Sequence, residues 1–134
     1  LALKTAYFQA LDPEISVKVY DAFSVPERAT YPYVIIASID VNEIVNSGCK
    51  SYNATVTLDI VTGFSSPTGM NSAYIIGGNI ESIINPMSRV NLDLSSYGYQ
   101  IGQTRSNSTP LQLRTDNFYI YRNIRTYSHI IWSI

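Results

Sequence analysis

The segment from Ser51 to Phe64 constrains the fold most strongly, because apolar and polar residues alternate along it. The apolar positions share one parity: Tyr52, Ala54, Val56, Leu58 and Ile60. Successive side chains of a strand point to opposite faces of a sheet, so this period of two predicts a strand with one buried and one polar face. Such a strand needs partners on both edges, and the chain is therefore expected to build a sheet.

A second strand is predicted just before it, from Tyr33 to Ile39. Its run of aliphatic residues follows Pro32 and indicates burial on both faces or a central place in the sheet. The residues from Val41 to Lys50 are mainly polar and contain Ser47-Gly48, a turn signal. We interpret the two strands as an antiparallel hairpin with a long loop, and long loops often carry function.

Two segments have helical periodicity. The first is a stripe ending at Leu11, closed by Asp12-Pro13, and its members are Leu3, Ala6, Tyr7, Ala10 and Leu11. The second is closed by Asn85-Pro86, and its stripe is Met70, Ala73, Ile76, Ile80 and Ile83. Gly77-Gly78 within the second helix indicates close approach to the sheet, with a hinge as the alternative.

Three further strands complete the expected fold. Alternation at Ile15, Val17 and Val19 predicts a strand near the start of the chain, and another is expected from Tyr97 to Asn107, with Tyr97, Tyr99 and Ile101 on one side. We expect residues 106–117 to be irregular. A long last strand begins at Phe118, and polar interruptions predict a bulge or bend near its middle. The apolar parity of this last strand comprises Phe118, Ile120, Ile124, Ile130, Trp132 and Ile134.

The order helix, three strands, helix, two strands predicts an α+β fold. We expect a single domain over residues 1–134, with a mostly antiparallel sheet of four to five strands. One long hairpin belongs to that sheet, and two helices pack on one of its faces.

Composition narrows the function classes. Charged residues are 14% of the 134 and the net charge is −1, so no basic patch for gripping nucleic acid is expected. The chain has eleven tyrosines, a residue type that is common in partly hydrated protein–protein interfaces. A general amino-acid bias of the source genome explains them equally well. Lys4, Thr5 and Gln9 break the apolar start, so neither a signal peptide nor a membrane span is expected, and we predict a soluble protein.

Reactive residues are few. The one histidine, His129, lies in an apolar strand, where a structural role is favoured over catalysis. The one cysteine, Cys49, is interpreted as an incidental thiol in an exposed loop, and together they are too few ligands for zinc. Asp40 and Glu43 are a weak candidate for a cation site, and a solvated loop is preferred. We predict no catalytic, cofactor-binding or metal-binding residues, and hence a protein that is not an enzyme.

The residues from Leu11 to Phe64 resemble the phage tail-completion and head–tail joining family, which includes tail terminators. The resemblance rests on Leu11-Asp12-Pro13 after a helix, Val19-Tyr20-Asp21, Pro26, and Pro32-Tyr33-Val34 opening a strand, followed by the alternating strand. Thr62-Gly63-Phe64 departs from it, because the family often has a tryptophan there. The C-terminal third matches only in general character.

This resemblance implies a structural virion protein at the neck or tail, assembled in the host cytoplasm. It implies a homo-oligomeric ring, commonly a hexamer, that caps the tail tube or joins it to the head–tail connector. DNA would pass through its channel without specific binding, and no cofactor or membrane is implied. The assembly interface is expected to include these residues: Asn42, Glu43, Val45, Asn46, Lys50, Tyr119, Tyr121 and Arg125.

One alternative remains open from the sequence. A small binding or adaptor domain outside the virion, working as a monomer or dimer, has the same lack of reactive residues. The size of the oligomer in solution separates the two hypotheses.

Overall fold

The computed structural model describes residues 2–12, 17–26, 30–44, 50–66, 69–85, 92, 94–115 and 118–133. Within these ranges it forms two α-helices, one short 3-10 helix and five strands. In chain order they are α1 (Ala2–Leu11), β1 (Lys18–Asp21), β2 (Tyr33–Ile44), β3 (Ser51–Phe64), α2 (Asn71–Ile84), η1 (Ser95–Tyr97), β4 (Tyr99–Thr115) and β5 (Phe118–Ser133).

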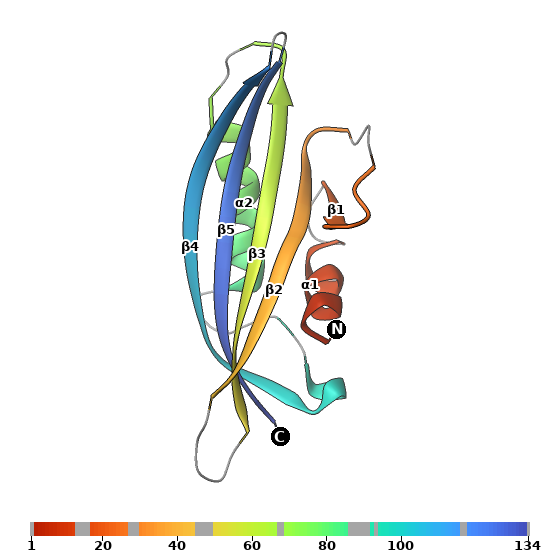
Figure 1. The fold of residues 1–134 in the computed structure, drawn as a ribbon, viewed down its shortest axis with the longest axis vertical. Coiled ribbons are helices and arrows are strands. Elements are labelled where there is room, and N and C mark those ends of the chain that lie inside the picture. The colour runs from red at the N-terminus through yellow and green to blue at the C-terminus, as the bar shows by residue number, and fades with distance from the viewer. Residues whose placement is uncertain are drawn as a thin grey trace.

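The five strands form one curled sheet in the order β1-β2-β3-β5-β4. Only β1 runs parallel to its neighbour β2, and the other neighbours are antiparallel. Figure 1 shows the long strands side by side, with β4 at one edge and β2 and the short β1 towards the other. The expected α+β class, the order of elements and the β2–β3 hairpin are thus confirmed.

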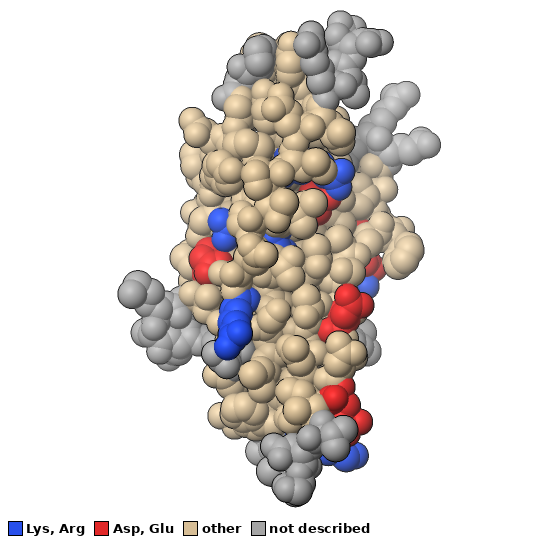
Figure 2. Space-filling model, turned by 60° about the vertical axis from the view of Figure 1, so that its left-hand side comes forward, with Lys and Arg blue, Asp and Glu red and all other residues tan. Residues whose placement is uncertain are grey.

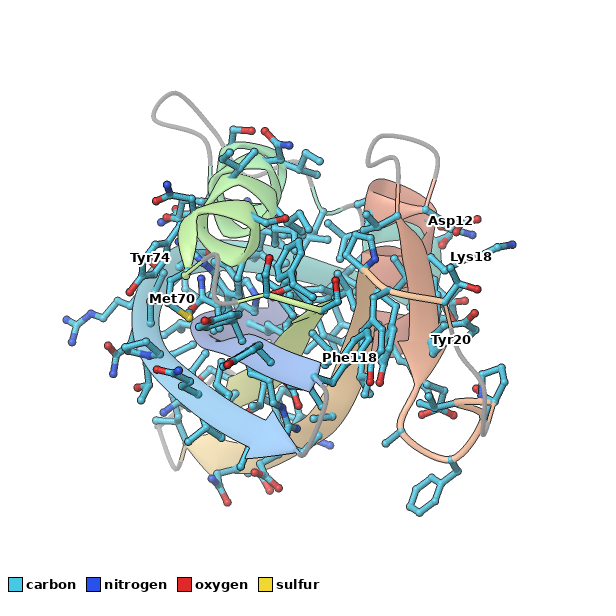
Figure 3. All side chains as sticks on the ribbon, turned by 90° about the horizontal axis from the view of Figure 1, so that it is seen from above. Asp12, Lys18, Tyr20, Met70, Tyr74 and Phe118 are labelled. Atoms are coloured by element: carbon cyan, nitrogen blue, oxygen red, sulfur yellow. The ribbon has the colours of Figure 1, made fainter. Side chains whose placement is uncertain are left out.

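Both helices pack on the same side of the sheet, as predicted. Seen from above in Figure 3, α1 and α2 lie next to one another over one face, and no helix of the described residues covers the other face. The hydrophobic core fills the space between the helices and this helix-covered face. Its largest members are fully buried and come from α1, α2, β3 and β5: Tyr7, Leu11, Leu58, Ile60, Ile80, Ile84 and Tyr127.

The two adjacent glycines of α2 have different surroundings. A Cβ atom on Gly77 would lie 2.5 Å from Nε of Arg125 and 2.7 Å from Nδ2 of Asn123, so Gly77 lets the helix approach β5. A Cβ atom on Gly78 would meet nothing within 4 Å. The predicted close approach is therefore confirmed, and it depends on one glycine of the pair.

The polar end of β2 was expected to be a loop, and this expectation is wrong. The strand continues to Ile44, and Val41, Asn42, Glu43 and Ile44 each pair with a residue of β3. Pairing with the strongly β-prone β3 outweighs the low strand propensity of the polar residues here. Residues 45–49, which hold the expected turn and Cys49, lie outside the described part of the chain.

The stretch expected to be irregular is also a strand, because β4 runs without interruption to Thr115. It contains Pro110, which lacks a backbone N–H and is tolerated because β4 is an edge strand. At the other end, Tyr97 belongs to η1 and not to the strand.

The β3–β5 register shows no bulge where a bulge or bend of β5 was expected, and register shifts lie in β2 and β4 instead. Pairing of β5 with β3 is continuous from Tyr119 to Trp132, whereas the β4–β5 register shifts between Ile101 and Gln103. Gly102 stands at that shift, and the indole ring of Trp132 occupies the space that a Cβ atom there would need. A glycine at this position therefore allows the tryptophan to lie across the bulge.

Strand β5 presents its more polar parity to the helices. Its buried residues under α1 and α2 are Tyr121, Asn123, Tyr127, His129 and Ile131. The aliphatic parity, including Ile120, Ile124 and Ile130, is half-buried on the face without helices. In this respect β5 differs from β3, whose apolar residues face the core. As a result, a strip of apolar side chains from β5 lies on the face without helices.

Candidate interaction surfaces

A buried polar network holds α1 against the sheet. The side chain of His129 is fully buried, and its Nε2 atom is hydrogen-bonded to the hydroxyl of Tyr7 in α1. Its Nδ1 atom lies 2.9 Å from the hydroxyl of Thr104 in β4. A neutral imidazole has one donor and one acceptor, so one hydroxyl donates to the ring and the other accepts from it. The histidine is structural, as the sequence predicts.

Burial also shifts the acidity of this network. It lowers the pKa of His129 to about 4, because the charged ring would lose its hydration. Burial raises the pKa of Tyr7, with smaller contributions from Tyr127 and Glu81. Both side chains are therefore neutral around pH 7, which suits a packing role.

A second cluster gathers around Glu81 of α2. Its carboxylate accepts hydrogen bonds from the hydroxyl of Tyr127 at 2.8 Å and from Nη1 of Arg125 at 3.2 Å. It also accepts from Ser106 of β4 at 3.0 Å and from the side-chain amide of Asn85 at 3.1 Å. Glu81 thereby ties the helix to β4 and β5. Two buried donors beneath Gly77, Nδ2 of Asn123 and Nε of Arg125, have no hydrogen-bond partner among the described residues.

Each cluster contains one potential metal ligand, His129 in the first and Glu81 in the second. Within the described ranges, no group of three or more His, Cys, Asp and Glu side chains is placed to hold a metal ion. Asp40 and Glu43 lie three positions apart along β2 and point to opposite faces of the sheet, so they do not form a shared cation site. No helix in the described part of the chain is long and apolar enough to cross a bilayer.

The face without helices carries the remaining large cluster. Arg122 forms an ion pair with Asp59, whose side chain is buried, and Nε of Arg122 donates to Oδ1 of Asp59 at 3.1 Å. The hydrogen bond to Asp59 raises the pKa of Arg122. Beside the pair lies an aromatic group in which Tyr31 stacks on Tyr33 at a centroid distance of 5.5 Å. Phe118 packs 5.7 Å from Tyr31.

Large apolar side chains remain exposed on this face. We define the open face as the helix-free side of β2, β3, β5 and β4. Four large apolar residues that are exposed lie on it: Ile44, Leu111, Leu113 and Trp132. Figure 2 brings forward the side of the molecule on which β4 lies, and its charged side chains are few and scattered. A low-charge, partly apolar surface of this kind is typical of protein–protein contact.

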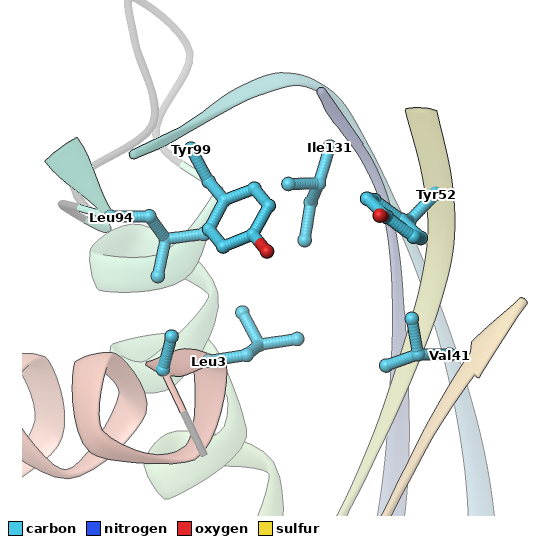
Figure 4. A pocket seen from close by; sticks show the side chains of 7 residues that line it. Leu3, Val41, Tyr52, Leu94, Tyr99 and Ile131 are labelled. Atoms are coloured by element: carbon cyan, nitrogen blue, oxygen red, sulfur yellow. The ribbon is translucent and has the colours of Figure 1, made fainter. Parts of the chain in front are cut away.

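An apolar pocket of about 310 Å³ lies at the other side of the sheet, near the start of α1. Figure 4 shows side chains from α1, β2, β3, β4 and β5 around it. Its lining residues are Ala2, Leu3, Val41, Tyr52, Leu94, Tyr99 and Ile131. Val41 is exposed, so the pocket opens towards the outer edge of β2.

The structure separates the expected interface residues into three groups. Asn42, Glu43 and Lys50 are exposed at the end of the β2–β3 hairpin, and Tyr119 is half-buried. Tyr121 is buried, and Arg125 is hydrogen-bonded to Glu81 beneath α2. These last two side chains are occupied inside the subunit. Val45 and Asn46 lie outside the described residues.

Sequence reasoning missed the open face and the edges of the sheet. The apolar parity of β5 was visible in the sequence, but nothing local shows that the helices cover the opposite parity. Leu111 and Leu113 carried the signal of a strand, and Pro110 between the two halves of β4 obscured it.

Comparison with known proteins gives a likeness of fold. No family model matches the sequence, and no curated protein matches it. Among solved structures, a chain of the virion of a native gene transfer agent particle is similar, with a TM-score of 0.70 and 12% sequence identity. The match covers 98% of this chain and 95% of that chain. At this identity the likeness shows that the two chains share one fold over nearly their whole lengths.

Proposed function

We propose that this protein is a structural subunit of a virus-like particle and has no catalytic role. The observation that carries the proposal is the shared fold with a chain of a gene transfer agent virion, over nearly the full length of both chains. The clusters around His129 and Glu81 are engaged in holding helices to the sheet, which agrees with a structural role.

Within the particle, we place the subunit in a ring at the head–tail interface, as a tail terminator, tail-completion or neck protein. The resemblance of residues 11–64 to that family supports this position, and a hexamer around a DNA channel is the expected arrangement. Neighbours would be further copies of the chain and the adjacent tail-tube or connector protein. The open face supports assembly, because leaving Ile44, Leu111 and Leu113 in water is less favourable than covering them.

The hairpin end supplies a direct test of this position. Asn42 and Glu43 are exposed at the end of β2, where the hairpin projects from the body of the molecule (Figure 1). Deleting Asn42 to Gly48 should give particles whose heads and tails fail to join, seen by negative-stain microscopy. A matched control exchanges Ser65 and Ser66, exposed beyond the other end of β3, for alanine. Normal joining after the deletion would refute the role of the hairpin end.

The apolar pocket favours a second candidate, a small ligand-binding or adaptor domain outside the virion. Its seven mainly apolar lining residues would take a small apolar group. Narrowing the pocket with Ala2→Leu separates the candidates. An adaptor would lose its ligand, whereas incorporation of a ring subunit into particles would not change.

A further inference from the structure

We infer that copies of this chain join edge to edge, with the outer edge of β2 in one copy pairing with the outer edge of β4 in the next. This inference deepens the proposed ring and names the contact that would build it. Four features support it: two free edges, their strand directions, their register and their charges.

Both edges are free among the described residues. Strand β1 pairs only with Tyr33 to Ile36 of β2, so the stretch 37–44 has β3 on one side, with a register shift at Ala37, and no described strand on the other. At the opposite end of the sheet, β4 pairs with β5 alone. Exposed edges of this length readily take up another strand.

The directions of the two strands are compatible. β2, β3, β5 and β4 alternate in direction across the sheet, so β2 and β4 run opposite ways. A neighbouring copy related by rotation about an axis roughly along the strands would keep these directions. Its β2 would therefore meet β4 as an antiparallel partner, continuing the pattern of the sheet. Because the two edges differ, such a contact is heterologous and can repeat until a ring closes.

The register across the sheet brings one acidic and one basic residue onto the same row. Asp40 of β2 pairs with Thr55, and Thr55 pairs with Ser128 of β5. Ser128 in turn pairs with Arg105 of β4. Side chains along such a row share one face of the sheet, so Asp40 and Arg105 both lie on the open face, at its opposite edges.

Charge complementarity follows from that row. The free stretch 37–44 carries Asp40 and Glu43 and no basic residue, and the matching stretch 100–107 carries Arg105 and no acidic residue. Asp40 and Arg105 are exposed, and neither has an ion-pair partner among the described residues. In a copy placed at the same height, Asp40 would stand opposite Arg105, a pairing that stabilises antiparallel strands.

The upper half of β4 is unsuited to this contact. Pro110 has no backbone N–H to donate to a further strand, which blunts the edge at that position. Thr109 aligns across the sheet with Ile35, whose outer edge is already paired with Tyr20 of β1. Residues 37–44 of β2 therefore lie on the same rows of the sheet as residues 100–107 of β4. The rows above them hold β1 at one edge and Pro110 at the other.

Disulfide cross-linking tests the contact directly. In a Cys49→Ser background, which removes the one native cysteine, Asp40→Cys combined with Arg105→Cys should give a ladder of cross-linked oligomers under mild oxidation. The experiment is done on particles and on the purified chain. Asp40→Cys with Thr109→Cys is the matched control, displaced by four residues or roughly 13 Å along β4, and should give none. Mixing the two single variants, Asp40→Cys and Arg105→Cys, should give dimers only.

Charge exchange provides an independent readout. Asp40→Arg or Arg105→Asp alone should weaken association about threefold to tenfold, and the double variant should restore it to within about twofold. Particles that contain the chain but give no Asp40–Arg105 cross-link would overturn this inference and leave the proposed function standing. Absence of the chain from particles would overturn the proposed function. The edge-to-edge contact would then be tested by the Asp40–Arg105 cross-link in the purified chain, and lack of that cross-link would overturn it. Self-cross-linking of Arg105→Cys would indicate a symmetric β4 dimer and contradict the contact.

Discussion

At the scale of single residues, a few positions decide how the helices meet the sheet. Gly77 allows α2 to lie against Arg125 and Asn123, while Gly78 faces solvent. His129 links α1 to β4 through its two ring nitrogens. These contacts are specific to side-chain identity, so each can be tested by one substitution and a close control.

The glycine pair provides the first prediction. Gly77→Ala should lower the free energy of unfolding by about 1–3 kcal/mol, because the new methyl group would overlap Arg125 or Asn123. Gly78→Ala should raise it by roughly 0.5–1 kcal/mol through helix propensity alone. Urea denaturation of both variants is the measurement. Equal effects of the two substitutions would show that α2 does not approach β5 at Gly77.

The second prediction concerns pH. The pKa of His129 is lowered from 6.5 to about 4 on folding, so the unfolded chain binds more protons between these values. The contribution of His129 to the free energy of unfolding is therefore fully present above pH 6.5. It is lost as the pH drops from 6.5 towards 4. The His129 contribution to that loss is on the order of 3 kcal/mol.

Urea denaturation at a series of pH values tests this window. His129→Gln removes the titrating group and should flatten the stability profile between pH 6.5 and 4 relative to the wild type. Tyr7→Phe keeps the histidine and should retain the slope while lowering stability at every pH. A wild-type profile that matches His129→Gln would mean that the ring is not buried.

At the scale of elements, the sequence predicts the interior strands and helices better than the edges. β3 and both helices follow from their own periodicity, because each buries one face against the core. The ends of β2 and β4 do not, because residues such as Asn42 and Pro110 are unfavourable in strands in general and are tolerated at edges. Which parity of β5 lies under the helices depends on tertiary packing, and its buried Asn123 and His129 gave no local signal.

The open face of β4 carries the element-scale prediction. Leu111 is exposed there, so Leu111→Glu should leave the isolated subunit folded and reduce its incorporation into particles several-fold. Ile75→Glu on the outer side of α2 is the control, because Ile75 is exposed on the opposite side of the molecule and should incorporate normally. Circular dichroism checks folding, and quantitative blotting of purified particles measures incorporation. Unchanged incorporation of Leu111→Glu would exclude the open face as a contact.

At the scale of the whole molecule, helices of the described residues cover one face of the sheet only, and within these residues its two edges are unpaired over long stretches. An isolated domain of this design exposes apolar surface and backbone hydrogen-bonding groups. Assembly would reduce both kinds of exposure, because neighbouring copies can pair with the sheet edges and cover the open face. The chain shares its fold with a chain of a gene transfer agent virion, and this likeness is compatible with such assembly.

The central claim is that the chain is a building block of a particle, placed as a ring between head and tail. Electron cryo-microscopy of purified particles, with the chain identified by mass spectrometry, tests it most directly. The account predicts density for this fold repeated around the tail axis at the head–tail junction. Particles that are complete and contain no copy of the chain, or that contain it away from that axis, would contradict it.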